Sequence, residues 1–461
     1  MKKNYLLGMA LMASLSFYSC DKEVVYVQDG NGVESVTDGA QIITLQVENG
    51  GDGLATRAGR PLYSAEAKQT IENVKVIVCN GSSVVYTKDF TKWNDSESSD
   101  SQEYTESGAH GRKTTIKLEG DDRLGKDQQY TVYAIGYHNN SDYKDKDGNN
   151  TLNALLSGIE VGGIFNENLT LKFTGSDNAE EIFAGSAELS ISEKGAGSAN
   201  VVLNRQVAGA FVYLKDIPYF AGAAKIDLVA STKNDQLILG KFANTDFTSN
   251  GNNSVEFSVI NGWNSEKSAS GQADETVIAS ITLSDWFTSI SNNNGLIDVT
   301  NWHNKYDPNN SVDNNPTFQK GSVFAGTFLV PFAKVGGTQT LKLVMKDSGN
   351  TQLAFWNVNL SASENNYTEL YTWNGSSFGE SSTTEELNKN SYSLVRNHLY
   401  GIGTRMNDQV DPENPGKDPD PEVPGEIPDP EDDEPESLNN KQELVLRVND
   451  NWEVIHGMEL D

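Results

Sequence analysis

Many short stretches of this chain either alternate between apolar and polar residues or are solidly apolar, whereas helical periodicity is scarce. Such stretches cover residues 74–78, 114–118, 130–137, 169–173, 201–212, 278–283, 324–330, 341–345 and 353–360. Clusters of Gly, Asn, Asp and Ser separate them. A repeat of two residues is the period of a β-strand with one buried face, so the pattern predicts an all-β protein.

The end of the chain carries the clearest alternation. Seven apolar residues there share even positions, as on one face of a strand: Leu444, Leu446, Val448, Trp452, Val454, Met458 and Leu460. The run 411–436 before them holds eight of the thirteen prolines and twelve acidic residues against one lysine. We expect this run to be an extended tether that holds the strand away from its own body.

An apolar strand on a semi-rigid tether suits a donor that completes the sheet of another molecule. On this hypothesis the seven even-numbered residues enter the neighbour's sheet. The alternative is a terminal strand that returns to its own domain.

A second informative strand lies near the beginning of the chain. Residues 41–48 alternate, with Ile43, Leu45 and Val47 on one face, and a glycine-rich stretch follows at 49–53. Arg57 and Ala58 come next. Flexible loops are the preferred sites of proteolysis, so the bond between Arg57 and Ala58 is a candidate cleavage site for a trypsin-like protease. The alternative is an ordinary surface arginine in a loop.

The first residues are typical of an export signal. Lys2 and Lys3 precede an apolar stretch at 6–17 that is too short to span a bilayer, and Cys20 follows. This order predicts a lipoprotein signal with Cys20 as the lipidated residue, and the alternative is a secretory signal with an accidental cysteine. Cys79 would then have no disulfide partner, and we expect it in the core.

Length and charge limit the remaining possibilities. A chain of 461 residues with 36% hydrophobic composition allows two or three domains. We expect two β-sandwich domains in series. The predicted organisation is a signal peptide at 1–20, a propeptide at 21–57, sandwich domains at 58–216 and 217–410, the tether at 411–436 and the donor segment at 437–461. The net charge of −30 argues against nucleic acid and anionic membranes as partners.

Signals for catalysis or metal binding are weak. Ser377 lies in a G-x-S-x-G pattern, but no Asp stands between it and His398, and a hairpin turn explains both glycines. The five histidines are scattered: His110, His138, His303, His398 and His456. Asp145, Asp147 and Asn149 resemble part of a calcium loop but lack its glycine and glutamate spacing, so a solvated turn is the simpler interpretation. We therefore expect a non-enzymatic protein without a cofactor.

Several further motifs complete the picture. They are Thr56-Arg57-Ala58-Gly59, Tyr130-Thr131-Val132-Tyr133-Ala134-Ile135, Val202-x-x-Arg205-x-x-Ala208, Arg396-Asn397-His398-Leu399-Tyr400, and Trp452 with His456. Together with the signal, the tether and the terminal strand, their order resembles the major fimbrial subunits (fimbrillins) of Bacteroidia. The pili of that family assemble by protease-triggered strand exchange.

The resemblance implies a transthyretin-like fold and a shaft subunit of a surface fimbria. An outer-membrane lipoprotein precursor would be cut after Arg57 by an arginine-specific protease, the 41–48 strand would leave, and the terminal strand of another copy would replace it. A donor and an acceptor on different surfaces build an open filament. The partners would be copies of itself, accessory fimbrial subunits and host or bacterial surface receptors. The alternatives are a fimbrial tip or anchor subunit and a surface glycan-binding lipoprotein.

Overall fold

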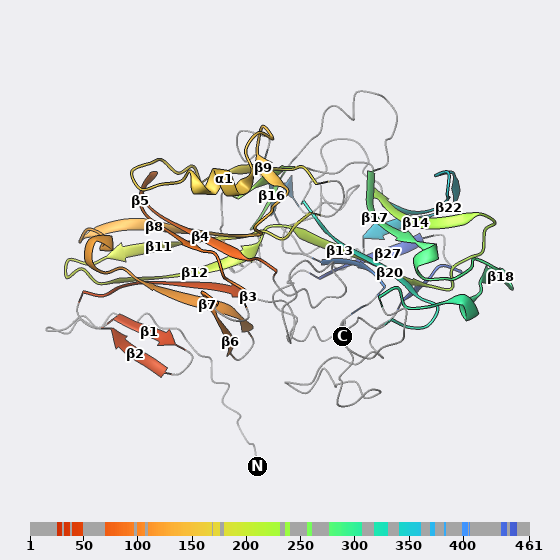
Figure 1. Cartoon of the computed structure of the whole chain (residues 1–461), viewed down its shortest axis with the longest axis horizontal. Helices are drawn as coiled ribbons and strands as arrows, with labels where there is room; N and C mark the ends of the chain where they lie inside the picture. The colour runs from red at the N-terminus through yellow and green to blue at the C-terminus, as the bar shows by residue number, and fades with distance from the viewer. Residues whose placement is uncertain are drawn as a thin grey trace, which may run out of the picture.

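The protein is described by a computed structural model, in which strands predominate (Figure 1). The residues that the structure describes are 25–29, 32–36, 39–48, 70–95, 99–106, 109–167, 169–175, 179–230, 236–239, 256–260, 276–306, 318–330, 341–360, 369–373, 382–383, 399–403, 405, 435–439 and 443–449. The strands far outnumber the single short α-helix among these residues. The expected all-β class is confirmed.

The first sheet holds eight strands in the order β5-β4-β8-β11-β12-β3-β7-β6. Their bounds are β3 (Gln41–Glu48), β4 (Asn73–Asn80), β5 (Ser83–Phe90), β6 (Gln102–Glu106), β7 (Ala109–Lys117), β8 (Gln128–Tyr137), β11 (Phe183–Ile191) and β12 (Gly197–Arg205). We call this sheet, with the segments that cover it, the N-terminal body. It lies to the left in Figure 1.

The path of the first sheet folds over between β11 and β12. The regular ladder between these strands covers only the pairs of Phe183 with Arg205 and Ala184 with Asn204. Gly185 permits the close approach there, because an added Cβ would collide with the Val202 carbonyl oxygen. Apolar residues of β4, β8 and β11 then share one buried cluster with residues of β3, β7 and β12. The alternating strands thus bury one face each against this common core.

The other face of β4 and β8 is covered by the segment between β8 and β11. This segment contains β9 (Tyr143–Asp145), α1 (Leu152–Ser157) and β10 (Thr170–Phe173), and β10 also pairs with β15 (Gln236–Ile238). The Thr151 side chain caps α1 by accepting a hydrogen bond from the Ala154 N–H. Leu152 and Leu156, four residues apart on one helix face, are buried.

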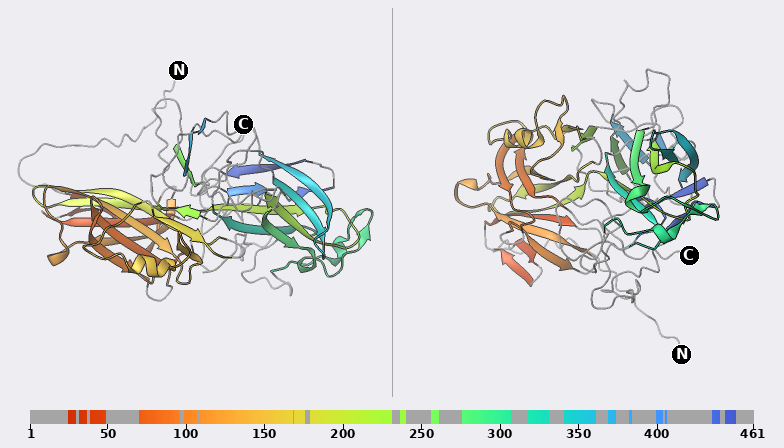
Figure 2. Two further views of the ribbon diagram at one scale, coloured as in Figure 1. Left: turned by 90° about the horizontal axis from the view of Figure 1, so that it is seen from above. Right: turned by 45° about the vertical axis from the view of Figure 1, so that its right-hand side comes forward.

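The second sheet follows the path β17-β14-β21-β22-β27-β25-β13-β20, and β26 pairs with β13 beside this path. The bounds are β13 (Ala208–Lys215), β14 (Ala223–Ala230), β17 (Thr276–Thr282), β20 (Val323–Leu329), β21 (Leu341–Asp347), β22 (Gln352–Leu360), β25 (Leu399–Ile402), β26 (Glu436–Ser437) and β27 (Glu443–Asn449). We call this the C-terminal body. The two bodies lie side by side in Figure 1 and in both views of Figure 2.

Short elements complete the described part of the chain. They are the hairpin β1 (Val25–Asp29) and β2 (Gly32–Val36), β16 (Glu256–Ile260) with β23 (Glu369–Trp373) and β24 (Ser382–Thr383), the pair β18 (Asn292–Asn293) and β19 (Leu296–Ile297), and the 3-10 turns η1 (Gly120–Asp122), η2 (Leu283–Asp285) and η3 (Val299–Asn301).

The expected domain boundary between residues 216 and 217 is wrong. β13 pairs with β20 and β25 and therefore belongs to the C-terminal body. The change of body falls at Gln206 and Val207, between β12 and β13. The sequence hides this boundary because β12 and β13 follow each other closely, separated only by Gln206 and Val207, with no loop of Gly, Asn, Asp or Ser between them.

A buried ion pair lies at this boundary. The Arg205 Nε atom lies 2.7 Å from Glu181 Oε1, and both side chains are at most 1% exposed. The guanidinium also stacks over the Phe183 ring. Because water cannot solvate either charge, each depends on the other.

We predict that Arg205→Met lowers the free energy of unfolding by about 3–5 kcal/mol, because it leaves the Glu181 carboxylate buried without its cation. Lys305→Met is the matched control, since Lys305 and Asp285 form an ion pair that is more than a third exposed on both sides. Its expected cost is below about 1 kcal/mol. Urea denaturation measures both values, and equal losses would contradict the prediction.

Candidate functional site: the slot of the first strand

β3 occupies an interior position in the first sheet. It runs parallel to β12, with Val47 beside Leu203, and antiparallel to β7, with Ile43 opposite Ile116. Backbone hydrogen bonds therefore hold it on both edges. We call the space between β7 and β12 the β3 slot.

The inward face of β3 forms part of the core. Ile43, Leu45 and Val47 are each 0% exposed and belong to the buried cluster of the N-terminal body. Removing β3 would expose the apolar residues around these side chains and leave two strand edges without backbone partners. The slot could then bind another strand with the same alternation.

Gln41 fixes the start of β3. Its side-chain Nε2 donates to the carbonyl oxygens of Leu124 and Gly195, at 3.1 Å each, and its Oε1 accepts from the Leu124 N–H at 2.8 Å. The residue is 2% exposed. Arg123 donates from the same loop to the carbonyl oxygens of Gly39 and Gly195. This arrangement, which we call the Gln41 clamp, fixes the position of β3 along its own axis.

The outward face of β3 is held by the edge strand β6. Gln46 Nε2 donates to the Tyr104 hydroxyl at 2.6 Å, across the intervening strand β7. Lys113 of β7, which is the register partner of Gln46, lies over the Tyr104 ring. A strand in this slot therefore meets a hydroxyl and a cation at the position of Gln46.

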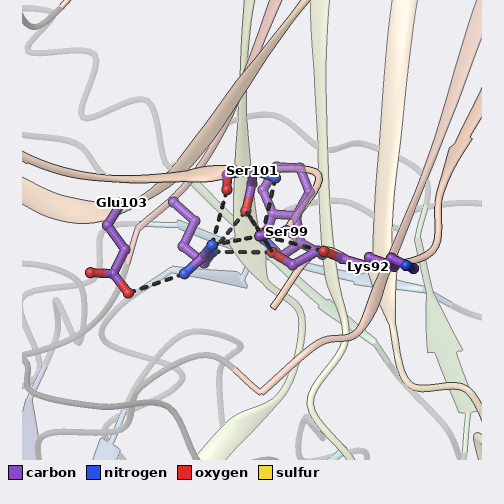
Figure 3. Close-up of polar contacts among 6 residues, drawn as sticks. Lys92, Ser99, Ser101 and Glu103 are labelled. Carbon is purple, nitrogen blue, oxygen red and sulfur yellow. Dashed lines mark hydrogen bonds and ion pairs between the residues drawn. The ribbon is translucent and has the colours of Figure 1, made fainter. Parts of the chain in front are cut away.

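A polar cluster lies beside the end of the slot that holds Val47 (Figure 3). Arg112, the register partner of Val47, donates to the Trp93 carbonyl at 3.1 Å and to the Ser101 hydroxyl at 2.7 Å. It also binds Ser99 at 2.7 Å and Glu103 at 3.1 Å. Burial lowers the Arg112 pKa from its usual value, although Glu103 opposes this. The cluster links β7 to β6 and to the loop between β5 and β6.

The terminal strand differs from its expected placement. The prediction that the tether holds it away from its own body is wrong: β27 runs parallel to β22 and antiparallel to β25 within the second sheet. The chain returns to this sheet at β26, and the Leu438 N–H donates to the Lys215 carbonyl at 3.1 Å. The physical reason is that a strand on the same chain competes for its own sheet at a high effective concentration.

The remaining candidate residues divide into two groups. Leu444, Leu446 and Val448 lie in β27. The others fall outside the described residues: Cys20, Arg57, Ala58, Trp452, Val454, Met458 and Leu460. The donor and cleavage roles of these residues stay predictions.

The weaker candidates have structural explanations where they are described. Asp145 accepts hydrogen bonds from the backbone N–H groups of Asn149 and Asn150, and these bonds lower its pKa, as in a self-contained turn. Cys79 is a free, buried thiol, and burial raises its pKa to about 11. Within the described ranges, His, Cys, Asp and Glu form no group that could hold a metal ion, and no helix is long and apolar enough to cross a membrane.

Three residues of the slot were not found from the sequence: Gln41, Tyr104 and Arg112. Gln41 has the same parity as Ile43, Leu45 and Val47, which could have marked it as an inward-facing polar residue. Its partners, however, lie 83 and 154 residues away in the chain. Nothing in the sequence indicates such contacts.

Known proteins resemble this chain in structure only. No family model and no curated protein matches the sequence. Similar solved structures include a candidate cell adhesion protein from Bacteroides eggerthii, at 12% identity and a TM-score of 0.36, which covers 90% of this chain and 96% of its own. A fimbrilin from Porphyromonas gingivalis covers 89% and 97% at 11% identity and a TM-score of 0.33. The fimbrial anchor protein Mfa2 from Porphyromonas gingivalis covers 77% and 99% at 10% identity and a TM-score of 0.30.

We predict that Leu45→Ala lowers the free energy of unfolding of the full chain by about 2–5 kcal/mol, because it leaves a cavity in a fully buried site. Thr44→Ala is the matched control on the partly exposed outward face of the same strand, with an expected change of about 0.5 kcal/mol. Thermal or urea unfolding measures both. A small loss for Leu45→Ala would mean that β3 contributes little to the core.

Proposed function

We propose that this chain is a subunit of a surface fimbria that polymerises after proteolysis at Arg57. The observation that carries the proposal is that β3, an interior strand with three fully buried side chains, directly precedes the segment that contains Arg57. One cut would convert a covalently held strand into a replaceable one. The precursor would be a lipoprotein with its lipid on Cys20, and its two bodies would be β-sandwich domains in series.

The energetics support an inert precursor. Burial of Ile43, Leu45 and Val47 contributes roughly 5–9 kcal/mol as an upper value. While β3 is attached to the chain, it also competes for the slot at an effective concentration near millimolar. Cleavage removes the second advantage permanently, so a strand from another copy then competes with β3 on equal terms.

The position of β27 limits which residues act as donor. If β27 left its own sheet to fill the β3 slot of a neighbour, it would open a gap between β22 and β25. The stability lost in its own second sheet would then offset the stability gained in the neighbour's first sheet. Donation by residues 450–461 would leave β27 in place and so would not open this gap. Trp452, Val454, Met458 and Leu460 continue the alternation of β27, and the segment is longer than the eight residues of β3. We therefore assign donation to residues 450–461.

Head-to-tail donation of this kind builds a filament, because the donor and the slot are different surfaces. The donor begins at the end of β27 in the C-terminal body, and the slot lies in the N-terminal body. Each subunit thus has one donor and one acceptor.

We predict that Arg57→Ala gives a lipidated monomer that does not polymerise, because β3 stays attached in its slot. Arg60→Ala is the matched control three residues further on, where Pro61 follows the arginine. It should polymerise normally. The measurement is a polymer ladder on an unboiled detergent gel after trypsin treatment of the purified precursor. Polymer from Arg57→Ala with a new N-terminus other than Ala58 would place the cut elsewhere.

Two deletions separate the roles of the terminal segments. Removing residues 450–461 should leave the melting temperature of the precursor almost unchanged and yield subunits that terminate filaments of intact protein. Removing residues 441–461 should also lower the melting temperature by several degrees, because it removes an interior strand of the second sheet. If the shorter deletion still polymerises, residues 450–461 are not the donor.

A further inference from the structure

Both ends of the segment that contains Arg57 lie at one end of β12. β3 and β12 are parallel, so Val47 lies beside Leu203, two residues before Arg205. The chain is described again from Thr70, whose N–H and hydroxyl both donate to Glu181 Oε2, at 3.0 and 2.6 Å. Glu181 in turn forms the buried ion pair with Arg205.

The contacts of Thr70 continue into its surroundings. Its hydroxyl oxygen lies 3.0 Å from His138 Nε2, and the residue itself is 8% exposed. Two residues on, the Glu72 N–H donates to the Tyr137 carbonyl at 3.1 Å, and β4 begins directly after it. Thr70 therefore stands where the chain enters the sheet.

The same cluster touches the junction between the two bodies. The Ala179 N–H, two residues before Glu181, donates to the Phe328 carbonyl of β20 in the C-terminal body at 3.0 Å. The Gln206 N–H donates to the Ile182 carbonyl at 2.8 Å, and Gln206 links β12 to β13. A displacement of Glu181 would thus disturb the strand entry and the junction together.

We propose that Thr70, Glu181 and Arg205 form an anchor. After a cut at Arg57, this anchor keeps the chain from Thr70 onward in its position. The proposal rests on the proposed function, because it assumes that β3 leaves after the cut. In the precursor, β3 and Thr70 hold the segment 49–69 at both ends. After the cut the part from residue 58 onward has a free end, and the anchor fixes the chain at Thr70, where it enters β4 beside the junction. The three residues are positioning residues.

The anchor can be tested with two substitutions of one residue. Thr70→Val keeps the shape and the backbone N–H but removes the hydroxyl that binds Glu181, whereas Thr70→Ser keeps a hydroxyl. Hydrogen–deuterium exchange of the β4 amides is measured in the precursor and in the assembled polymer, with the β21 amides as the internal reference. We expect exchange of β4 in the Thr70→Val polymer to be about tenfold or more faster than in wild type, with Thr70→Ser close to wild type.

The comparison of precursor and polymer gives the test its specificity. In the Thr70→Val precursor, the β4 amides should exchange much less rapidly than in the polymer of the same variant. The reason is that β3 is still joined to the segment 49–69 and holds its first end. Equal acceleration in both forms would indicate a general stabilising role and overturn the anchor, as would unchanged exchange in the polymer. If wild-type protein forms no polymer after the cut at Arg57, the proposed function fails instead, so the two failures are distinguishable.

Discussion

The backbone pairing of an interior strand is the constraint on which this structure depends. β3 satisfies the N–H and C=O groups of β7 on one edge and of β12 on the other, and it fills the core between them with three side chains. Such a strand cannot be lost without replacement, because two sheet edges and a patch of apolar surface would face water together. The slot therefore needs an occupant, and in this structure that occupant is β3.

Polar side chains decide how a strand must sit in the slot. Apolar contacts alone would tolerate a shift of two residues, since every second residue points inward. The Gln41 clamp excludes such a shift of β3, because the Gln41 side-chain amide bonds to three backbone groups of buried loops. The contact between Gln46 and Tyr104 adds a second fixed point on the outward face. The register of β3 is thus fixed on both of its faces.

Local patterns in the sequence were enough for the all-β class and for the alternation of β3, because both depend on neighbours in the chain. Contacts between distant segments were not accessible in this way. The clamp joins Gln41 to residues 83 and 154 positions away. The boundary at Gln206 was hidden within one apolar run, and the proline-rich tether gave no indication that β27 pairs with β22 and β25. In each case the partner, rather than the segment itself, determines the outcome.

On the proposed function, the two interior strands β3 and β27 have different roles. Each lies between one parallel and one antiparallel strand, so the two fill the same kind of position in their sheets. Yet β3 precedes a candidate cleavage site, whereas β27 follows a long tether and precedes a further alternating segment. Cutting the chain near β3 loosens one strand only and leaves the second sheet complete. On the proposed function, such a subunit would keep a complete second sheet while its first sheet lacks a strand, and residues 450–461 would supply that strand to the next copy.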